Sequence, residues 1–205
     1  MSSSFVQSTR RLLRTFRQEK IIYERFIFLA IKGIIFDLDG TLVDTLDDLT
    51  DSMNFALKTL GFPTHSRDRC RQMIGYGLTQ FAGRALGAGN VAHRDKLLEV
   101  MTGHYRDHCF HKTKPYCGIV DVVLRLHQQG MRLAVLTNKN QEPAEKITEF
   151  YFGKGVFDPI MGHQAGRRTK PDPEGVVAIM DRWRLPASEV ILLTSLARCT
   201  SPWGT

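Results

Sequence analysis

Four short apolar runs, each continued by polar residues, constrain the fold of this chain more than any other feature of its sequence. They are residues 33–37, 132–138, 156–162 and 189–195. A segment with apolar residues at helical spacing precedes each of the three later runs; these segments are 119–130, 142–152 and 173–185. Continuous apolar runs of this length are typical of buried strands, and their alternation with helices is typical of parallel strands joined by right-handed crossovers. We therefore predict a parallel α/β sheet with its functional residues at the carboxyl ends of the strands.

The stretch between the first and second runs differs, because residues 47–115 carry no strand signal. Apolar residues recur there at helical spacing and Gly61 then ends the helix; they are Leu46, Leu49, Met53, Phe55, Ala56 and Leu60. Further helices are expected over residues 68–89 and 93–110. The sequence thus predicts a helical insert after the first strand.

The composition indicates a globular protein of one domain with an added insert. The chain has 205 residues, of which 42% are hydrophobic and 24% are charged. The longest apolar piece near the start, residues 26–31, is far shorter than the ~18–20 residues of a membrane span. The four cysteines, Cys70, Cys109, Cys117 and Cys199, form no CxxC pair. We therefore expect reduced thiols, a cytoplasmic location and no membrane partner.

The charge of the chain is basic, with a net value of +7. Part of this positive charge lies in residues 1–32, a basic N-terminal extension. The other basic residues are scattered and form no motif in which basic and aromatic residues alternate. We therefore expect no nucleic-acid partner, since a small anionic substrate suits a mildly positive protein equally well. Two interpretations of the extension stay open: a solvated or upstream-translated segment, and a transit-like or surface-seeking amphipathic helix. The oligomeric state is not predicted.

Three aspartates follow the first apolar run, in the stretch GIIFDLDGTLVDT at residues 33–45. They are Asp37, Asp39 and Asp44, grouped around a glycine. Like charges this close repel one another, which raises the pKa of one carboxyl group and suits it to hold a proton. The structural alternative is that Asp39 and Asp44 are loop and helix-capping residues, as aspartate is common at helix N-termini.

Three segments occur in a fixed order along the chain: FDLDGTLVDT at 36–45, LAVLTNK at 133–139 and RTKPDPEG at 168–175. In this order they resemble motifs I to III of the haloacid dehalogenase (HAD) superfamily of phosphotransferases. The pieces IGYGL at 74–78 and HYRDHCFHKTKPYCG at 104–118 look most similar to phosphoglycolate phosphatases. The resemblance covers about residues 33–193.

The resemblance implies a fold and an activity. The fold would be a Rossmann-like HAD core formed by residues 33–46 and 116–205, with a helical cap over residues 47–115. The activity would be Mg²⁺-dependent hydrolysis of a small phosphate monoester, and 2-phosphoglycolate is the substrate that the resemblance favours most. A sibling phosphatase and a phosphosugar mutase on the same scaffold are the near alternatives.

The resemblance also implies roles for the two leading aspartates. Asp37 would attack phosphorus and form an aspartyl-phosphate, and Asp39 would protonate the leaving oxygen and then activate water. Mg²⁺ would bind the carboxylate of Asp37 and the backbone carbonyl of Asp39, neutralising charge between the carboxylates and the phosphate.

The remaining motif residues would bind the phosphoryl group. Gly40 would let the backbone turn and Thr41 would offer its amide or hydroxyl to phosphate. The other predicted phosphate-binding residues are Thr137, Asn138 and Lys170, with Thr137 and Lys170 also taken as catalytic through their stabilisation of developing charge. Taken singly, Thr137 and Asn138 are equally typical of an ordinary turn, and Lys170 could equally be a lysine exposed to solvent.

The chain departs from the family pattern after the fourth strand. The family carries Gly-Asp-Ser and a further aspartate there, whereas residues 194–205 contain no Asp or Glu and Thr194 or Ser195 stands at the acid's position. One hypothesis is a shifted reading frame over residues 198–204; genuine divergence is the other. We expect a C-terminally incomplete core with weak Mg²⁺ affinity and weak or absent turnover. An inactive fragment that binds phosphate or a partner is therefore the alternative to an enzyme.

Three smaller features complete the candidates. His104, His108 and His111 lie near one helical face, with Cys109 beside His108. They could form a zinc site, or they could be the solvated end of a helix. Gly75 and Gly77 indicate either a loop that closes over substrate or a simple helix break. Three cap arginines, Arg69, Arg71 and Arg84, are candidates for binding a substrate carboxylate.

Overall fold

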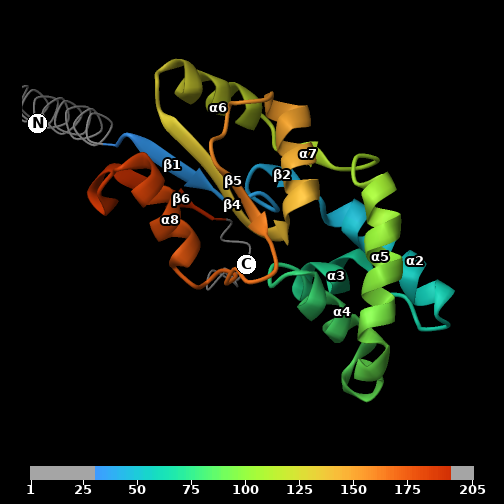
Figure 1. Cartoon of the computed structure of the whole chain (residues 1–205). Helices are drawn as coiled ribbons and strands as arrows, with labels where there is room; N and C mark the ends of the chain where they lie inside the picture. The colour runs from blue at the N-terminus through green and yellow to red at the C-terminus, as the bar shows by residue number, and fades with distance from the viewer. Residues whose placement is uncertain (1–30, 195–205) are drawn as a thin grey trace, which may run out of the picture.

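The computed structural model describes residues 31–194, and its centre is a four-stranded parallel sheet with strand order β5-β4-β1-β6 (Figure 1). The strands are β1 (Gly33–Phe36), β4 (Arg132–Asn140), β5 (Ile160–His163) and β6 (Val190–Leu193). The predicted parallel α/β architecture is confirmed. The expectations for residues 1–30 and for residues 195–205 lie outside the described part of the chain.

Helices cover both faces of the sheet because successive strand residues point to opposite sides. Ile34 and Phe36 of β1 pack on the face covered by α6 (Ile119–Gln128) and α7 (Gln141–Phe152). Ile35 points to the other face, against α8 (Glu174–Trp183). Figure 1 shows α6 and α7 on one side of the strands and α8 on the other. A sheet buried on both faces explains why its strands read as continuous apolar runs.

The insert is helical and has its own apolar core. Its elements are α2 (Leu46–Thr59), α3 (Arg67–Met73), α4 (Leu78–Leu86), the short helix η1 (Ala88–His93) and α5 (Arg94–His108). Its buried cluster runs from Leu46 to Cys109 and shares no residue with the two clusters at the sheet. Separate cores support the proposed division into a cap and a discontinuous core domain.

Two details of the insert differ from the sequence prediction. Residues 47–115 are not free of strand, because β3 (Lys114–Pro115) pairs antiparallel with β2 (Val43–Asp44). Strands of two residues are too short to produce a period that a sequence pattern could reveal. The helix expected over 68–89 is broken after α3, where Gly75 and Gly77 have φ of 100° and 86°. Such positive φ values end a helix.

Two boundaries also shift. Along α2, Leu57 is fully buried while Phe55 is 47% exposed, so Phe55 does not belong to the apolar face predicted for this helix. The third strand begins at Ile160 rather than at residue 156. Phe157 instead packs edge-on against Phe36 with ring centroids 5.9 Å apart. The apolar residues at 156–157 are thus core residues of the loop before β5.

The short helix η2 (Ala187–Glu189) lies between α8 and β6. Among residues 31–194, no helix combines the length and apolar character that crossing a membrane requires.

Residue 162 of β5 must be a glycine, because backbone atoms of a neighbouring segment lie too close to leave room for a Cβ. A Cβ at this position would lie 2.6 Å from Gln141 Cα and 2.8 Å from the Lys139 carbonyl oxygen. We expect Gly162→Ala to lower the free energy of unfolding by about 1–3 kcal/mol, since backbone atoms cannot rotate away. Gly103→Ala is the matched control: that site on α5 is exposed and open, so a gain of about 0.5–1 kcal/mol is expected. Urea unfolding of both variants tests the pair, and equal effects would contradict the prediction.

Candidate active site

A pocket of about 540 Å³ lies between the carboxyl ends of β1 and β4 and the cap. Six of the seven predicted site residues line it: Asp37, Asp39, Gly40, Thr137, Asn138 and Lys170. The cap contributes side chains from α2, α3, α4 and α5 to the opposite wall. Residues that are separated by more than a hundred positions in sequence therefore meet at one edge of the sheet, where parallel α/β folds place their ligands.

Asp37 directly follows β1 and is fixed by both backbone and side-chain contacts. Its N–H donates to the Leu193 carbonyl at 2.8 Å, and its Oδ1 accepts from the Leu38 N–H at 2.8 Å. Lys170 Nζ lies 2.7 Å from the same Oδ1. Burial raises the pKa of Asp37, and the Lys170 ammonium opposes that rise by favouring the carboxylate.

Lys170 is itself held by the end of β4. Its ammonium also donates to the Leu136 carbonyl at 2.9 Å. Its backbone N–H donates to Asn138 Oδ1 at 2.8 Å, and Asn138 Nδ2 donates back to the Lys170 carbonyl at 3.0 Å. The Asn138 side chain therefore positions the loop that carries Lys170, a function that its residue type alone did not indicate.

Asp39 has a lysine partner of its own, which the sequence analysis missed. Lys139 Nζ donates to Asp39 Oδ1 at 3.0 Å, and the Thr45 hydroxyl donates to the same oxygen at 2.7 Å. The Lys139 side chain is 3% exposed and its ammonium lies 4.7 Å from the ring centroid of Tyr105 on α5. The available signal was the lysine in LTNK, at the end of an apolar strand.

Burial and charge act in opposite directions on this lysine. Burial favours the neutral amine, yet the carboxylate of Asp39 raises the pKa of Lys139 above its ordinary value. Burial raises the pKa of Tyr105 to about 12, so its phenol stays protonated. Each of the two aspartates thus has a lysine partner, Asp37 with Lys170 and Asp39 with Lys139.

Gly40 and Thr41 form the turn after Asp39. Gly40 has φ of 79°, and its N–H donates to the Val43 carbonyl at 2.9 Å. The Thr41 N–H donates to the Leu38 carbonyl at 3.2 Å, and its buried hydroxyl has no hydrogen-bond partner among the described residues. Thr41 is the one predicted site residue that does not line the pocket.

Asp44 also lines the pocket but has structural partners. Its Oδ1 accepts from the Leu46 N–H at 3.1 Å at the start of α2, and its Oδ2 lies 3.4 Å from Arg67. These contacts support the helix-capping interpretation of this third aspartate.

The cap meets the core at the turn between α3 and α4. Asn138 Nδ2 donates to the Gly75 carbonyl at 3.3 Å, and Gly75 and Gly77 line the pocket. The two glycines therefore both break the helix and form part of the pocket wall.

Of the three cap arginines, only Arg71 lines the pocket. Arg84 lies over the ring of Tyr76 at 4.3 Å and donates to the Met73 carbonyl, while Arg69 donates to Gln72.

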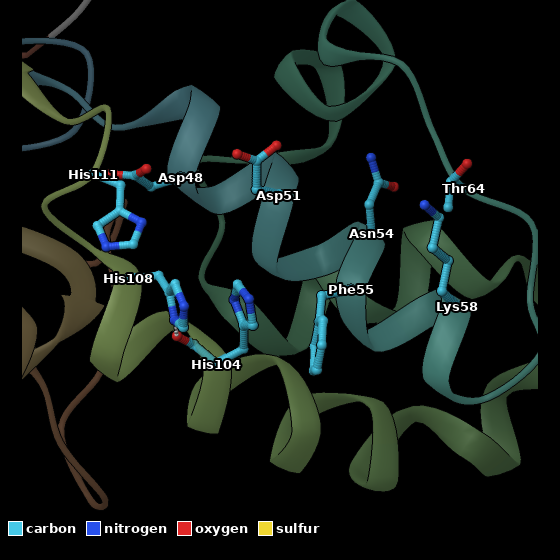
Figure 2. Close-up of a pocket in the computed structure, with 9 residues that line it drawn as sticks. All are labelled: Asp48, Asp51, Asn54, Phe55, Lys58, Thr64, His104, His108 and His111. Atoms are coloured by element: carbon cyan, nitrogen blue, oxygen red, sulfur yellow. Dashed lines mark hydrogen bonds between the residues drawn. The ribbon is translucent and has the colours of Figure 1, made fainter.

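The histidines of the cap lie elsewhere. His104, His108 and His111 line a second pocket, shown in Figure 2, that shares no residue with the first. Cys109 is buried and does not line that pocket.

The active-site pocket suits a magnesium ion that takes only one or two of its ligands from the protein. The described residues contain no group of three or more His, Cys, Asp or Glu side chains placed to hold a metal. The aspartates that line the pocket are Asp37, Asp39 and Asp44. Mg²⁺ is commonly bound by one or two carboxylates, with water and substrate phosphate completing the octahedron.

Comparisons with known proteins agree on one family. The model of the haloacid dehalogenase-like hydrolases matches residues 34–193. A phosphoglycolate phosphatase of Mesorhizobium japonicum is 34% identical over 144 residues, covering 68% of this chain and 63% of that protein. A phosphoglycolate phosphatase of Aliivibrio fischeri is 29% identical over 174 residues, covering 82% and 77% respectively. The crystal structure of a predicted phosphoglycolate phosphatase from Haemophilus somnus has a TM-score of 0.76 at 25% identity, covering 80% of this chain and 77% of that one.

Proposed function

The chain belongs to the haloacid dehalogenase-like hydrolase family and is a phosphoglycolate phosphatase-like phosphoric monoester hydrolase, and on that premise we propose that it hydrolyses 2-phosphoglycolate to glycolate and phosphate. The observation that carries the proposal is the pairing of Asp37 with Lys170 at 2.7 Å and of Asp39 with Lys139 at 3.0 Å, at the wall of one pocket. We include in the proposal the cytoplasmic location expected from the cysteine pattern.

In the first half-reaction Asp37 acts as the nucleophile. Its carboxylate oxygen forms a bond to phosphorus while the bond from phosphorus to the glycolate oxygen breaks, which leaves an aspartyl-phosphate. The Lys170 ammonium favours the ionised carboxylate despite burial, and the Leu38 N–H fixes the orientation of the group. The nucleophile is therefore held in position before substrate arrives.

Asp39 acts as the general acid and then as the general base. In its protonated form it gives a proton to the leaving glycolate oxygen, and in its ionised form it takes one from the water that attacks the aspartyl-phosphate. Contacts with Thr45 and Lys139 hold this carboxyl group against the pocket wall. Release of inorganic phosphate then restores Asp37.

The phosphoryl oxygens need positive charge and hydrogen-bond donors around them. Lys170, the Thr137 hydroxyl and the backbone at Asn138 lie at the ends of the central strands and supply these groups. Gly40 allows the turn at Asp39, and the backbone N–H of Thr41 donates to the Leu38 carbonyl within it. A Mg²⁺ ion held by Asp37 and the Asp39 carbonyl would supply further charge neutralisation.

Arg71 is the group that we expect to bind the carboxylate of the substrate, because it is the one candidate arginine at the pocket. We expect Arg71→Met to raise KM for 2-phosphoglycolate about tenfold to a hundredfold, as a charge-assisted hydrogen bond is lost. Hydrolysis of ethyl phosphate, which has no carboxylate, should change little. Arg84→Met, at an arginine already stacked on Tyr76, is the matched control. Equal losses on both substrates would contradict this role.

Phosphate release from 2-phosphoglycolate by the purified full chain tests the proposed function. We expect release that requires Mg²⁺, is lost with EDTA and exceeds that from other small phosphate esters. Because residues 194–205 contain no acidic side chain, we expect saturation only at high Mg²⁺ concentration. Release without substrate preference would favour a sibling phosphatase, an isomerised phosphosugar would favour a mutase, and no turnover would favour the inactive alternative.

A further inference from the structure

Tyr105 of α5 is a buried residue of the active-site pocket to which the proposed function gives no role. It belongs to the wall that the cap contributes, and it is only 3% exposed. Its hydroxyl is buried and forms no hydrogen bond with any of the described residues. Buried hydroxyls without a partner are costly and rare in native proteins. At the wall of a ligand pocket, such a group indicates that the ligand supplies the partner.

The partner of this hydroxyl must be a hydrogen-bond acceptor. Burial raises the pKa of Tyr105 to about 12, so the phenol keeps its proton at neutral pH. The Lys139 ammonium lies 4.7 Å from the centroid of the phenol ring, but an ammonium group only donates hydrogen bonds. Lys139 therefore cannot accept the phenol proton, whereas an oxygen of the substrate can.

The cap offers few polar groups to a substrate. Among the described residues of α2 to α5 that line the pocket, two have polar side chains, Arg71 and Tyr105, and the others are apolar. An anionic group placed against such a wall needs hydrogen-bond donors, because an unpaired charge in an apolar site is costly. The guanidinium of Arg71 and the phenol of Tyr105 are the side-chain donors that these helices provide.

Tyr105 lies on the side of the pocket where the leaving group is expected. Its neighbour Lys139 holds Asp39, the general acid of the proposed mechanism, at 3.0 Å. Asp39 gives its proton to the leaving oxygen, and in 2-phosphoglycolate the carboxyl carbon is two bonds from that oxygen. The phosphoryl group, by contrast, is bound at the strand ends by Lys170 and Thr137. The carboxylate is thus the acceptor that a donor on the cap can reach.

We propose that the Tyr105 hydroxyl donates a hydrogen bond to the carboxylate of the substrate, as a second donor in addition to Arg71. Tyr105 is then a specificity-determining residue that favours phosphate esters of small hydroxy acids over esters of uncharged alcohols. A carboxylate forms a stronger hydrogen bond with this donor than a neutral acceptor does. The inference rests on the proposed function, because it names the group that recognises the leaving part of that substrate.

Binding of two non-hydrolysable phosphonates to the full chain tests the inference by calorimetry in MgCl2. The first, 3-phosphonopropionate, has the shape of 2-phosphoglycolate with a methylene in place of the bridging oxygen. The second, propylphosphonate, carries a methyl group in place of the carboxylate. We expect Tyr105→Phe to weaken binding of 3-phosphonopropionate about tenfold to a hundredfold and to leave binding of propylphosphonate unchanged. Equal losses for both ligands, unchanged binding of 3-phosphonopropionate, or no binding of it by the unmodified chain would overturn the inference.

Thermal unfolding without ligand separates recognition from a structural role. Tyr105→Phe keeps the ring beside Lys139 and removes a hydroxyl that has no partner among the described residues, so the unfolding temperature should not fall. Tyr151→Phe is the matched control, because that hydroxyl donates to the Thr113 carbonyl at 2.5 Å and Tyr151 does not line the pocket. The control should unfold at a lower temperature and bind both phosphonates as the unmodified chain does. Destabilisation of Tyr105→Phe to the same extent would contradict the inference.

The inference and the proposed function can fail separately, because phosphonate binding needs no turnover. A chain that binds 3-phosphonopropionate through Tyr105 but releases no phosphate from 2-phosphoglycolate would contradict the proposed hydrolysis and support the inference. A Tyr105→Phe variant that hydrolyses 2-phosphoglycolate with the KM and kcat of the unmodified chain would support the proposed function and overturn the inference.

Discussion

Asp37→Asn is expected to abolish phosphate release from 2-phosphoglycolate, with a loss of at least about a thousandfold in kcat. The amide is nearly the same size as the carboxylate, so the substitution leaves the pocket's shape intact. It removes the nucleophilic oxygen charge and the partner of Lys170 Nζ, which lies 2.7 Å away. Without that nucleophile no aspartyl-phosphate can form, and direct attack of water on the ester has a much higher barrier.

The measurement is phosphate release at saturating substrate and Mg²⁺, with the unfolding temperature of each protein recorded beside it. Asp121→Asn, at an exposed aspartate on α6, is the control and should retain full turnover. If Asp37→Asn retained comparable turnover while Asp121→Asn did too, the nucleophile would have to be another group. The proposed mechanism would then be wrong even if the activity were real.

Lys139→Met is expected to lower the free energy of unfolding by about 1–3 kcal/mol. Lys139 is among the most buried charged groups of the described chain, with a side chain 3% exposed and its ammonium 3.0 Å from Asp39 Oδ1. Methionine fills a similar volume but leaves the Asp39 carboxylate without its cationic partner. The ring of Tyr105 also loses the ammonium that lies 4.7 Å from its centroid. Urea denaturation gives the difference directly.

Two further variants separate charge from packing. Lys154→Met, at an exposed lysine, should change stability by no more than about 0.5 kcal/mol. The double variant Asp39→Asn/Lys139→Met should recover part of the loss, because no half-buried carboxylate is then left without its cationic partner. A double variant as unstable as Lys139→Met alone would attribute the loss to packing rather than to the ion pair.

The sheet and the positions of the strand-end residues could be predicted because they depend on local patterns. The run GIIF is buried on both faces and therefore apolar throughout, so the first polar residue after it marks the end of β1. That residue is Asp37, and the same reasoning places Thr137 near the end of β4. Parallel strands then bring such residues to one edge without any knowledge of the contacts.

The contacts themselves could not be predicted, because they depend on side chains far apart in sequence. Lys139 is a hundred positions from Asp39, and its place at the end of an apolar strand does not indicate which residue it contacts. The buried Asp48 of α2 is a similar case: it accepts hydrogen bonds from the backbone N–H groups of Lys112 and Thr113 and from the Thr113 hydroxyl. From the sequence, Asp48 is indistinguishable from an ordinary acidic residue in the first turn of a helix.

The pairing of β2 with β3 has a consequence for how the chain folds. Val43 faces Pro115 across this pair, so the chain leaves the core and returns to it at the same point. β1 and β4 are neighbours in the sheet but are separated in sequence by the whole cap. Joining them would otherwise require closing a long open loop, which is slow and entropically costly. Because the cap has a core of its own and the β2–β3 pair joins its two ends, the folded cap shortens the distance over which β1 and β4 have to meet.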